Sequence, residues 1–511
     1  MNVNSDAYPK KNDGREPPLL PEIPSEPERP GSGASDSAAL LYMQIYQELR
    51  GKIVNGEWPP GTRLPSQREL AARLGVNRST VVTALGRLAA EGLVQGNRGG
   101  GTRVALADRE QTPFSPRTWN DYVEEGSHYP NLPAVQAINR LEFEEGLIRL
   151  GTGEPAPELL PQQALQSILS ELSQQPLSLS YEEPLGNLRL RTALSAYLRD
   201  RGVHVSPGGI LVVSGAIQGL QLVALGLLPR NSTVLVEKPS YLYSIHAFQS
   251  AGIKFSGLSM DEGGLLPEEA ERRCRDSRAA MLYTIPSFHN PTGTLMDAER
   301  RRRLIETAAR TGLPILEDGA YHDLWLDAPS PPPIKAMDTE GRVLYLGSLS
   351  KAVSPGLRIG WVAGPEPVVR RLADIKMQAD YGAASLSQLV AAKWLEDGHH
   401  ERHCSTLRGQ LRARRESCLS LLNTHFRELA DWNRPGGGFY IWLTLRRPLP
   451  PAKLFNEALR EGLLLNTGDL YERGDGRHLR LSYAYASAAE MQRGLPALAS
   501  LIRRLNQKHG G

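Results

Sequence analysis

The hydrophobic pattern between residues 38 and 106 predicts a small domain of short helices. Apolar residues recur at helical spacing in a first segment, at Leu41, Ile45, Leu49 and Ile53. A second segment begins at Ser66, which can cap a helix while Glu69 completes a capping box, and it ends at Gly75. A third begins at Asn77 and is expected to bury Val81, Val82, Leu85 and Leu88 before Gly92. The segment from Leu93-Val94 to Thr102-Arg103-Val104, with a glycine-rich tip between them, predicts a hairpin.

Beyond residue 147, short apolar runs alternate with helical segments. The runs that we expect to be strands are 210–213, 233–237, 280–284, 314–317 and 343–346. Strands that alternate with helices are typical of a mostly parallel α/β sheet. A long basic helix over 401–422 and apolar strands near 439–443 and 479–483 predict a smaller C-terminal α+β subdomain.

Composition adds the domain limits to this picture. The chain has 511 residues, and its first 37 are rich in Pro, Glu, Gly and Ser, which is typical of a disordered segment. We therefore predict a multi-domain protein: a disordered tail over 1–37, an α+β head over 38–106, a linker over 107–146 and a large α/β domain over 147–508. The large domain is expected to divide into subdomains at about 175–395 and 396–508.

Charge and cysteine content restrict the class of protein. The net charge is only +3, so contact with DNA would require a local basic patch. Cys274, Cys404 and Cys418 lie far apart, without a disulfide framework or a CxxC metal-ligand pair. The chain has no apolar leader and no apolar run of about 18 residues. We expect a cytoplasmic protein without a metal site or a membrane span.

The second and third helical segments predict a helix-turn-helix. The first residues of a recognition helix enter the major groove, so we expect DNA contacts from Asn77, Arg78, Ser79 and Thr80. Arg78 can bind guanine with two hydrogen bonds, whereas Ser79 and Thr80 suit phosphate oxygens. Further contacts are expected from Arg68 on the preceding helix and from Arg98 and Gly99 in the hairpin tip. On spacing alone, a generic helical hairpin with a solvated polar end is the alternative.

The run PPGTRLPSQRELAARLGVNRSTVVTALGRLAAEGLVQ weakens that alternative. It resembles the winged helix-turn-helix head of GntR-type bacterial regulators, which contact DNA at the positions of Arg68, Arg78, Ser79, Thr80 and the glycines of the hairpin tip. The resemblance implies double-stranded operator DNA as a partner.

The large domain contains side chains suited to pyridoxal 5′-phosphate (PLP). This cofactor needs an amine for a Schiff base, a carboxylate for its pyridine nitrogen and donors for its ring oxygen. We predict Lys351 for the amine and Asp318, at a strand end, for the carboxylate. Tyr321 and Asn290 are predicted donors to the ring oxygen.

The remaining parts of the predicted site bind the phosphate and cover the ring. Ser348, Ser350 and Arg358 are phosphate-binding candidates. The backbone of Gly215, Ala216 and Ile217 follows a strand and opens a helix, where N–H groups can hold a dianion. Tyr241 is suited to stack on the ring. Each motif alone is ordinary: a solvated lysine, a helix cap or a turn.

The order of the motifs SGAIQG, EKPSY, HNPTG, EDGAY, SLSK and GLRIG is more specific. It resembles fold type I PLP enzymes, and among them the class I and II aminotransferases, over about 350 residues. The resemblance implies that Arg480 binds the substrate carboxylate and that Gly153 lies in a substrate-side loop. It also implies that Tyr181 reaches the phosphate of a neighbouring subunit.

A GntR-type head joined to an aminotransferase-like domain resembles the MocR subfamily of bacterial regulators. The resemblance implies a domain-swapped homodimer that senses an amino compound through PLP on Lys351. Two alternatives remain open at this point: a catalytically active aminotransferase that carries a DNA-binding head, and a sensor of PLP itself. GABA-responsive relatives have an arginine where this chain has Tyr243, which argues against GABA as the effector.

Overall fold

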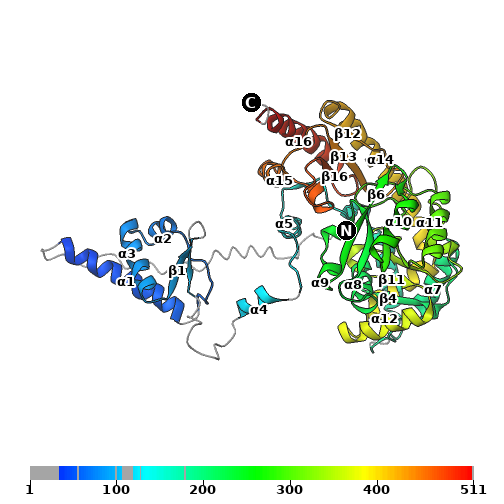
Figure 1. Ribbon diagram of the computed structural model, residues 1–511, viewed down its shortest axis with the longest axis horizontal. Helices are drawn as coiled ribbons and strands as arrows, with labels where there is room; N and C mark the ends of the chain where they lie inside the picture. The colour runs from blue at the N-terminus through cyan, green and yellow to red at the C-terminus, as the bar shows by residue number, and fades with distance from the viewer. Residues whose placement is uncertain are drawn as a thin grey trace, which may run out of the picture. The chain divides into compact units, whose positions relative to one another are not determined.

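The computed structural model describes residues 34–54, 57–97, 101–105, 119–126, 128–177 and 180–508. The chain forms two compact units, residues 1–126 and 127–511 (Figure 1). Residues 1–33, most of the predicted tail, lie outside the described residues, as do 106–118 of the predicted linker. None of the described helices combines the length and apolar character that a membrane crossing requires.

The first unit is a helical head with a hairpin. Its elements are α1 (Ala34–Val54), α2 (Gln67–Arg73), α3 (Arg78–Ala90), β1 (Val94–Asn97), β2 (Gly101–Val104) and α4 (Trp119–Glu125). The strands are antiparallel, with Val94 opposite Val104. Side chains from α1, α2, α3 and both strands form one core, which includes Ile45, Leu49, Leu70, Val81, Leu85, Leu88, Val94 and Val104. The head therefore has a hydrophobic core of its own.

Local signals place the two helices of the helix-turn-helix. Ser66 caps α2, its hydroxyl accepts from the Glu69 N–H and the Glu69 carboxylate accepts from the Ser66 N–H, so the predicted capping box is confirmed. Gly75 adopts a φ of 63° after the last turn of α2, a conformation that favours glycine. Asn77 caps α3 by accepting from the Ser79 N–H.

One predicted core position in α3 is wrong. Val82 is 43% exposed, and Ala84 is buried in its place. Each residue turns the helix by about 100°, so Val82 points well away from its buried neighbour Val81. The predicted burial of Val81, Leu85 and Leu88 is confirmed.

The second unit is built on a mixed sheet in the order β4-β11-β10-β9-β8-β5-β6-β7. The strands are β4 (Ile210–Val213), β5 (Thr233–Lys238), β6 (Lys254–Asp261), β7 (Gly264–Leu265), β8 (Met281–Thr284), β9 (Ile315–Asp318), β10 (Val343–Ser348) and β11 (Gly360–Ala363). The five strands expected from the sequence are confirmed, and β6, β7 and β11 are additional. β5, β6, β8, β9 and β10 are parallel, whereas β11 runs antiparallel to both β10 and β4.

Alternating strand residues enter two separate hydrophobic cores. Leu235, Leu282 and Ile315 pack with α10 and α11, whereas Val234, Tyr283 and Leu316 belong to the main core on the other face. Helices therefore cover both faces of the sheet (Figure 1). The helices up to this point in the unit are α5 (Pro133–Leu141), α6 (Gln162–Leu172), α7 (Leu188–Arg199), α8 (Ala216–Gly226), α9 (Ala247–Ser250), α10 (Pro267–Ser277), α11 (Ala298–Thr311), α12 (Glu366–Ala379) and α13 (Ser385–Glu396).

The C-terminal part forms a second, four-stranded sheet in the order β12-β13-β16-β15. Its elements are α14 (His399–His425), β12 (Ala430–Trp432), β13 (Tyr440–Leu445), α15 (Pro451–Arg460), β14 (Leu463–Leu464), β15 (Asn466–Thr467), β16 (His478–Ser482) and α16 (Ala488–Lys508). This is the α+β subdomain expected from the sequence.

The predicted linker over 107–146 contains two helices, α4 and α5. Ile138 of α5 packs into a cluster with Phe455 and Leu464 of the C-terminal part. The strand β3 (Ile148–Arg149) pairs in parallel with β14. The segment from α5 to β3 therefore packs on the C-terminal subdomain. It also forms one wall of the cavity described below.

Candidate cofactor cavity and DNA-binding head

The large unit contains a cavity of about 550 Å³ at the carboxyl ends of its parallel strands. In open α/β sheets this edge is where ligands bind. Twelve of the residues predicted for the cofactor or its substrate line it: Gly153, Ala216, Ile217, Tyr241, Asn290, Asp318, Tyr321, Ser348, Ser350, Lys351, Arg358 and Arg480. Segments that are distant in sequence thus meet in one site.

Asp318 is a buried carboxylate at the end of β9. It is 5% exposed, and it accepts hydrogen bonds from the Tyr283 hydroxyl at 2.8 Å and from the Ala320 N–H at 3.0 Å. Burial raises the pKa of Asp318, although these two bonds and the charge of Lys351 oppose the rise. The cavity therefore presents an incompletely compensated anion, which a protonated ring nitrogen would balance.

Lys351 follows the end of β10, and it lines the cavity. Its ammonium donates to the Gly153 carbonyl at 2.7 Å. The nearby Ser350 hydroxyl is buried and has no hydrogen-bond partner among the described residues. The Ser348 hydroxyl accepts from the Ser350 N–H at 3.1 Å and so shapes this turn. An orphaned buried hydroxyl beside a lysine is a polar group that a bound ligand can satisfy.

The start of α8 and Arg358 form a corner of the cavity suited to an anion. Arg358 donates to the Ser214 carbonyl at 3.0 Å, which holds its guanidinium against this helix N-terminus. A Cβ atom at Gly215 would lie 2.3 Å from Nη2 of Arg358, and Gly215 has a φ of 82°. Only glycine therefore allows the arginine to approach so closely. A helix N-terminus with an adjacent guanidinium favours a phosphate group.

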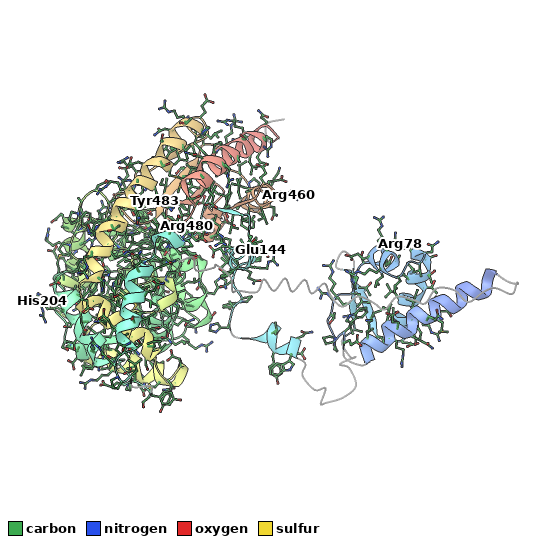
Figure 2. All side chains as sticks on the ribbon, turned by 180° about the vertical axis from the view of Figure 1, so that it is seen from behind. Arg78, Glu144, His204, Arg460, Arg480 and Tyr483 are labelled. Atoms are coloured by element: carbon green, nitrogen blue, oxygen red, sulfur yellow. The ribbon has the colours of Figure 1, made fainter. Side chains whose placement is uncertain are left out.

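Arg480 on β16 provides a second cationic end. Its side chain is buried, with Nη1 donating to Oδ1 of Asn290 at 2.8 Å and Nη2 donating to the Gly151 carbonyl at 2.6 Å. Its Nε has no partner among the described residues. Figure 2 labels Arg480 inside the large unit. A guanidinium that lines a cavity with a free donor is suited to a carboxylate.

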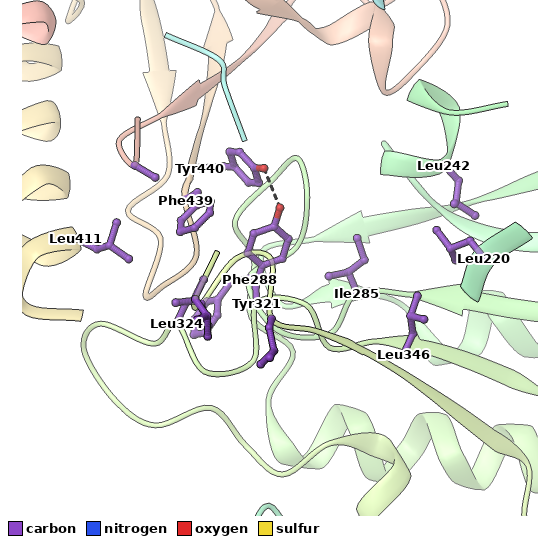
Figure 3. Close-up of a cluster of buried hydrophobic side chains, with 14 of the residues drawn as sticks. Leu220, Leu242, Ile285, Phe288, Tyr321, Leu324, Leu346, Leu411, Phe439 and Tyr440 are labelled. Atoms are coloured by element: carbon purple, nitrogen blue, oxygen red, sulfur yellow. Dashed lines mark hydrogen bonds between the residues drawn. The ribbon is translucent and has the colours of Figure 1, made fainter. Parts of the chain in front are cut away.

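Tyr440, at the start of β13, connects the C-terminal subdomain to the cavity. Its hydroxyl and that of Tyr321 lie 2.8 Å apart and share a hydrogen bond (Figure 3). The Arg480 guanidinium lies over the Tyr440 ring, 4.2 Å from its centroid. Burial and the proximity of Tyr440 hold the pKa of Tyr321 well above its usual value, so Tyr321 stays protonated and able to donate.

Several residues that line the cavity were not expected from the sequence. They include Glu142, Glu154, Tyr440, Asn466 and Tyr471. Glu154 directly follows the predicted Gly153 in the GTGEP motif, so its position could have been inferred. The other four have no such local signal, because they reach the cavity through long-range packing.

Tyr181 does not line the cavity. It is 82% exposed, and its ring packs edge-on against the ring of Tyr381, with 4.9 Å between the centroids. Tyr381 has a φ of 56° and is itself 55% exposed. The predicted contact of Tyr181 with a neighbouring subunit stays a prediction.

The head exposes polar side chains at the start of α3. Asn77, Arg78 and Ser79 are exposed and Thr80 is half-buried; Figure 2 labels Arg78. Arg78 donates to the Gln67 side chain, with Nη2 at 3.1 Å, which ties the start of α3 to the start of α2. Arg68 on α2 is also exposed. The predicted contacts Arg98 and Gly99 lie outside the described residues.

Comparisons with known proteins agree with both units. Residues 145–498 match the family model "Aminotransferase class I and II", which covers more than half of the chain. The chain belongs to this family. Residues 41–104 match the model "Bacterial regulatory proteins, gntR family". A GntR-type head joined to an aminotransferase-like domain is the arrangement of the MocR subfamily. The resemblance to this subfamily, predicted from the motifs, is confirmed.

Relatives share this arrangement along their whole length. The HTH-type transcriptional regulator YisV of Bacillus subtilis is 47% identical, over 91% of this chain and 96% of its own. The HTH-type transcriptional regulator NorG of Staphylococcus aureus is 29% identical, over 87% of this chain and 100% of its own. The protein is accordingly a transcription regulator with an aminotransferase-like domain.

Solved aminotransferase structures match the large unit. The multiple substrate aminotransferase of Thermococcus profundus has a TM-score of 0.71 and 28% identity, over 77% of this chain and 100% of its own. The kynurenine aminotransferase of Pyrococcus horikoshii, solved in complex with PMP, has a TM-score of 0.71 and 28% identity, over 78% of this chain and 98% of its own. The expected fold type I architecture is confirmed, and the family implies PLP as the cofactor.

Proposed function

We propose that the protein is a PLP-dependent transcription regulator whose aminotransferase-like domain binds an amino compound at Lys351. The observation that carries the proposal is the cavity itself. Lys351 lines it together with a buried carboxylate, Asp318, and a buried guanidinium, Arg480, in a chain that also has a GntR-type head. A DNA-binding function implies that the protein works in the cytoplasm with the chromosome.

The residues of the cavity fit PLP. Asp318 would hold the protonated ring nitrogen, because its burial leaves the carboxylate in need of a cation. The phosphate would take the corner formed by Arg358, Ser348, Ser350 and the backbone of Gly215, Ala216 and Ile217. Tyr241 would cover the ring, and Asn290 and Tyr321 would donate to its ring oxygen. When bound, PLP supplies an aldehyde that condenses reversibly with primary amines, those of Lys351 and of an amino compound.

The chain's own side chains would orient the amino compound. Arg480 would bind its carboxylate, since the guanidinium is held by Asn290 and Gly151 and has a donor to spare. The Gly153 carbonyl, which accepts from the Lys351 ammonium, marks the place where an incoming amine would compete for the same position. Release of Lys351 from the cofactor would be the local event that the rest of the molecule detects.

Regulation requires that the amino compound bind two arrangements of the protein with different affinities. We infer a domain-swapped homodimer in which Tyr181 reaches the neighbouring phosphate. Its exposed ring beside Tyr381 supports this, because a large exposed aromatic pair favours burial against another surface. The two heads of a dimer would bind two operator half-sites, with Arg68, Asn77, Arg78, Ser79, Thr80, Arg98 and Gly99 as DNA contacts.

A catalytically active aminotransferase that carries a DNA-binding head is the second candidate. The cavity supports this candidate, because Lys351, Asp318 and Arg480, which transamination would use, all line it. Repeated conversion of an amino donor to its keto acid would favour this candidate. A third possibility is that PLP alone is the effector, in which case the apo and holo proteins would differ in DNA affinity without any amine.

DNA footprinting upstream of the protein's own gene tests the regulatory function. We expect a protected site whose extent or affinity changes when PLP and an amino compound from a panel are added together. Arg78→Ala should abolish protection, whereas Lys351→Ala should leave protection but remove its response to the amine. No protected site under any condition would contradict the regulatory function.

A further inference from the structure

Two carboxylates line the cavity in addition to the side chains expected to hold PLP. Glu142 follows α5, and Glu154 lies in the loop after β3. Asp318, Arg358 and Lys351 are assigned to the ring nitrogen, the phosphate and the aldehyde of the cofactor. Arg480 is then the remaining cation suited to the amino compound, and Glu142 and Glu154 are the remaining anions.

The surroundings of Glu154 leave its charge poorly compensated. Burial raises its pKa first, and the nearby Glu142 carboxylate raises it further, whereas Lys351 and Arg149 lower it. Arg149 does not line the cavity: it donates to the Tyr485 hydroxyl at 2.7 Å, with its guanidinium 4.9 Å from the centre of that ring. Once PLP engages the Lys351 amine, Glu154 loses the support of that ammonium.

The negative charge of Glu142 is also poorly compensated. Its carboxylate accepts from the neutral Thr152 hydroxyl at 2.9 Å, and within the described residues it makes no ion pair. The negative charge of Glu142 favours the protonated form of Arg480, as do Tyr440, Tyr471 and Tyr321. When Arg480 pairs with a ligand carboxylate, its positive charge no longer compensates the negative charge of Glu142. Because the amino compound would also release Lys351 from the cofactor, the bound cavity would then contain two carboxylates, Glu142 and Glu154, and one uncommitted ammonium, that of Lys351.

A ligand that brings a positive charge of its own would balance the second carboxylate. Arg480 provides the independent sign that a ligand belongs here, because it is buried, lines the cavity and has an Nε without a partner among the described residues. A second carboxylate on the ligand would add a third negative charge beside Glu142 and Glu154, so an acidic amino acid would be disfavoured. A neutral side chain would leave one of the two glutamates uncompensated.

We propose that the amino compound is a diamino carboxylic acid of the lysine or ornithine class. Its carboxylate pairs with Arg480, one amine meets the cofactor and the second ammonium pairs with Glu142 and Glu154. This rests on the proposed function, which it deepens by naming the chemical class of the effector.

The test is calorimetric titration of the PLP-loaded full-length protein with matched ligands. L-Lysine and L-ornithine are compared with L-norleucine, which has the side-chain length of lysine without its ammonium, and with L-glutamate. We expect lysine or ornithine to bind roughly 10- to 100-fold more tightly than norleucine, as charge pairs in partly buried sites do, and glutamate to bind most weakly. Higher salt should reduce the preference.

Variants assign the preference to these two side chains. Glu142→Gln and Glu154→Gln should each weaken lysine binding and reduce the ratio of lysine affinity to norleucine affinity. Glutamine keeps the size of the side chain and, at position 142, an acceptor for Thr152. Glu144→Gln is the matched control, because Glu144 lies on the same loop, is exposed and does not line the cavity (Figure 2). It should keep the full preference.

The ligand comparison on the wild-type protein decides the matter even if a variant fails to fold. Equal affinity for lysine and norleucine, or tighter binding of glutamate, would overturn the proposed ligand class while leaving the regulatory function standing. A preference for lysine that survives both glutamine substitutions would also overturn it. Failure of every amino acid to bind the PLP-loaded protein would instead overturn the proposed function together with this inference.

Discussion

Replacing Asp318 by asparagine should have opposite effects on cofactor binding and on the stability of the cofactor-free protein. Asparagine has the same shape but carries no charge: its oxygen can still accept from the Ala320 N–H, and its NH2 group can donate to the Tyr283 hydroxyl oxygen. Burial raises the pKa of Asp318 above the unfolded value of about 3.8. The carboxyl group therefore costs stability once the pH rises above that value and its ionised form is forced into the folded state. At neutral pH, asparagine removes this cost.

The expected changes in PLP affinity and in apo stability both follow from the buried surroundings of Asp318. A hydrogen bond between a buried carboxylate and a cationic ring nitrogen contributes about 1.5–3 kcal/mol. Its loss should weaken PLP binding roughly 10- to 150-fold. In the cofactor-free protein, each unit of pKa shift corresponds to about 1.4 kcal/mol, so Asp318→Asn should melt at the same temperature as the wild type or a few degrees higher.

The assay is a PLP titration followed by absorbance, together with thermal melting of the apo proteins. Glu317→Gln is the matched control, because Glu317 is the preceding residue of β9 and its carboxylate accepts from the backbone N–H groups of Ile334 and Lys335. It does not line the cavity. This control should keep its PLP affinity. Burial raises the pKa of Glu317 as well, but glutamine has one acceptor oxygen for two backbone N–H groups, so the lost hydrogen bond should lower the stability. PLP binding by Asp318→Asn within twofold of wild type, or a loss of apo stability as large as that of Glu317→Gln, would refute the reasoning.

Three further predictions concern other parts of the molecule. Leu88→Ala should destabilise the head by about 2–5 kcal/mol, because the side chain is fully buried, whereas the exposed Val82→Ala should change its stability by less than about 0.5 kcal/mol; thermal melting and operator affinity measure both. Gly215→Ala should weaken PLP binding more than pyridoxal binding, because the new Cβ would displace Arg358 from the phosphate corner; parallel titrations check this. His400→Asn should destabilise the protein most below pH 6.5, and the deficit should shrink as the pH rises to 10. Burial opposes the charged form, yet hydrogen bonding to Asp323 raises the pKa of His400 to about 10, so the pair contributes at most about 5 kcal/mol and loses this contribution as the histidine deprotonates.

Specific outcomes would contradict these three predictions. Equal melting of the Leu88 and Val82 variants would contradict the assignment of the head's core. An equal loss of PLP and pyridoxal affinity in Gly215→Ala would place the damage outside the phosphate corner. A stability deficit of His400→Asn that does not vary between pH 6.5 and 10 would show that the pair with Asp323 is uncharged.

Local sequence signals were sufficient where the structure depends on local physics. The capping box of Ser66 and Glu69 and the turn at Gly75 follow from hydrogen bonding and backbone conformation within a few residues. The buried strands β4, β5, β8, β9 and β10 follow from continuous apolar runs. The failures have equally physical reasons. Val82 is apolar but turns away from the core, and the strand β11 (Gly360–Ala363) is short, begins with glycine and is stabilised by pairing with β4 and β10.

The residues of the cavity also divide into those that the sequence could predict and those that it could not. Lys351, Asp318 and Arg358 belong to motifs with a recognisable order, so their convergence could be predicted. Glu142 and Tyr440 have no motif. Glu142 reaches the cavity because α5 packs on the C-terminal subdomain, and Tyr440 because β13 pairs with β16 beside Arg480. Such positions depend on contacts between segments that are far apart in the sequence, which a single sequence does not reveal.

Borohydride reduction of the PLP-loaded protein, followed by peptide mapping, is the most direct test of the central claim that Lys351 holds the cofactor. Reduction converts the reversible link between PLP and an amine into a stable bond. The account predicts one modified peptide, which contains Lys351, and its loss when an amino compound that binds the cavity is added before the reduction. Modification of other lysines, or none at all in a protein saturated with PLP, would contradict the account.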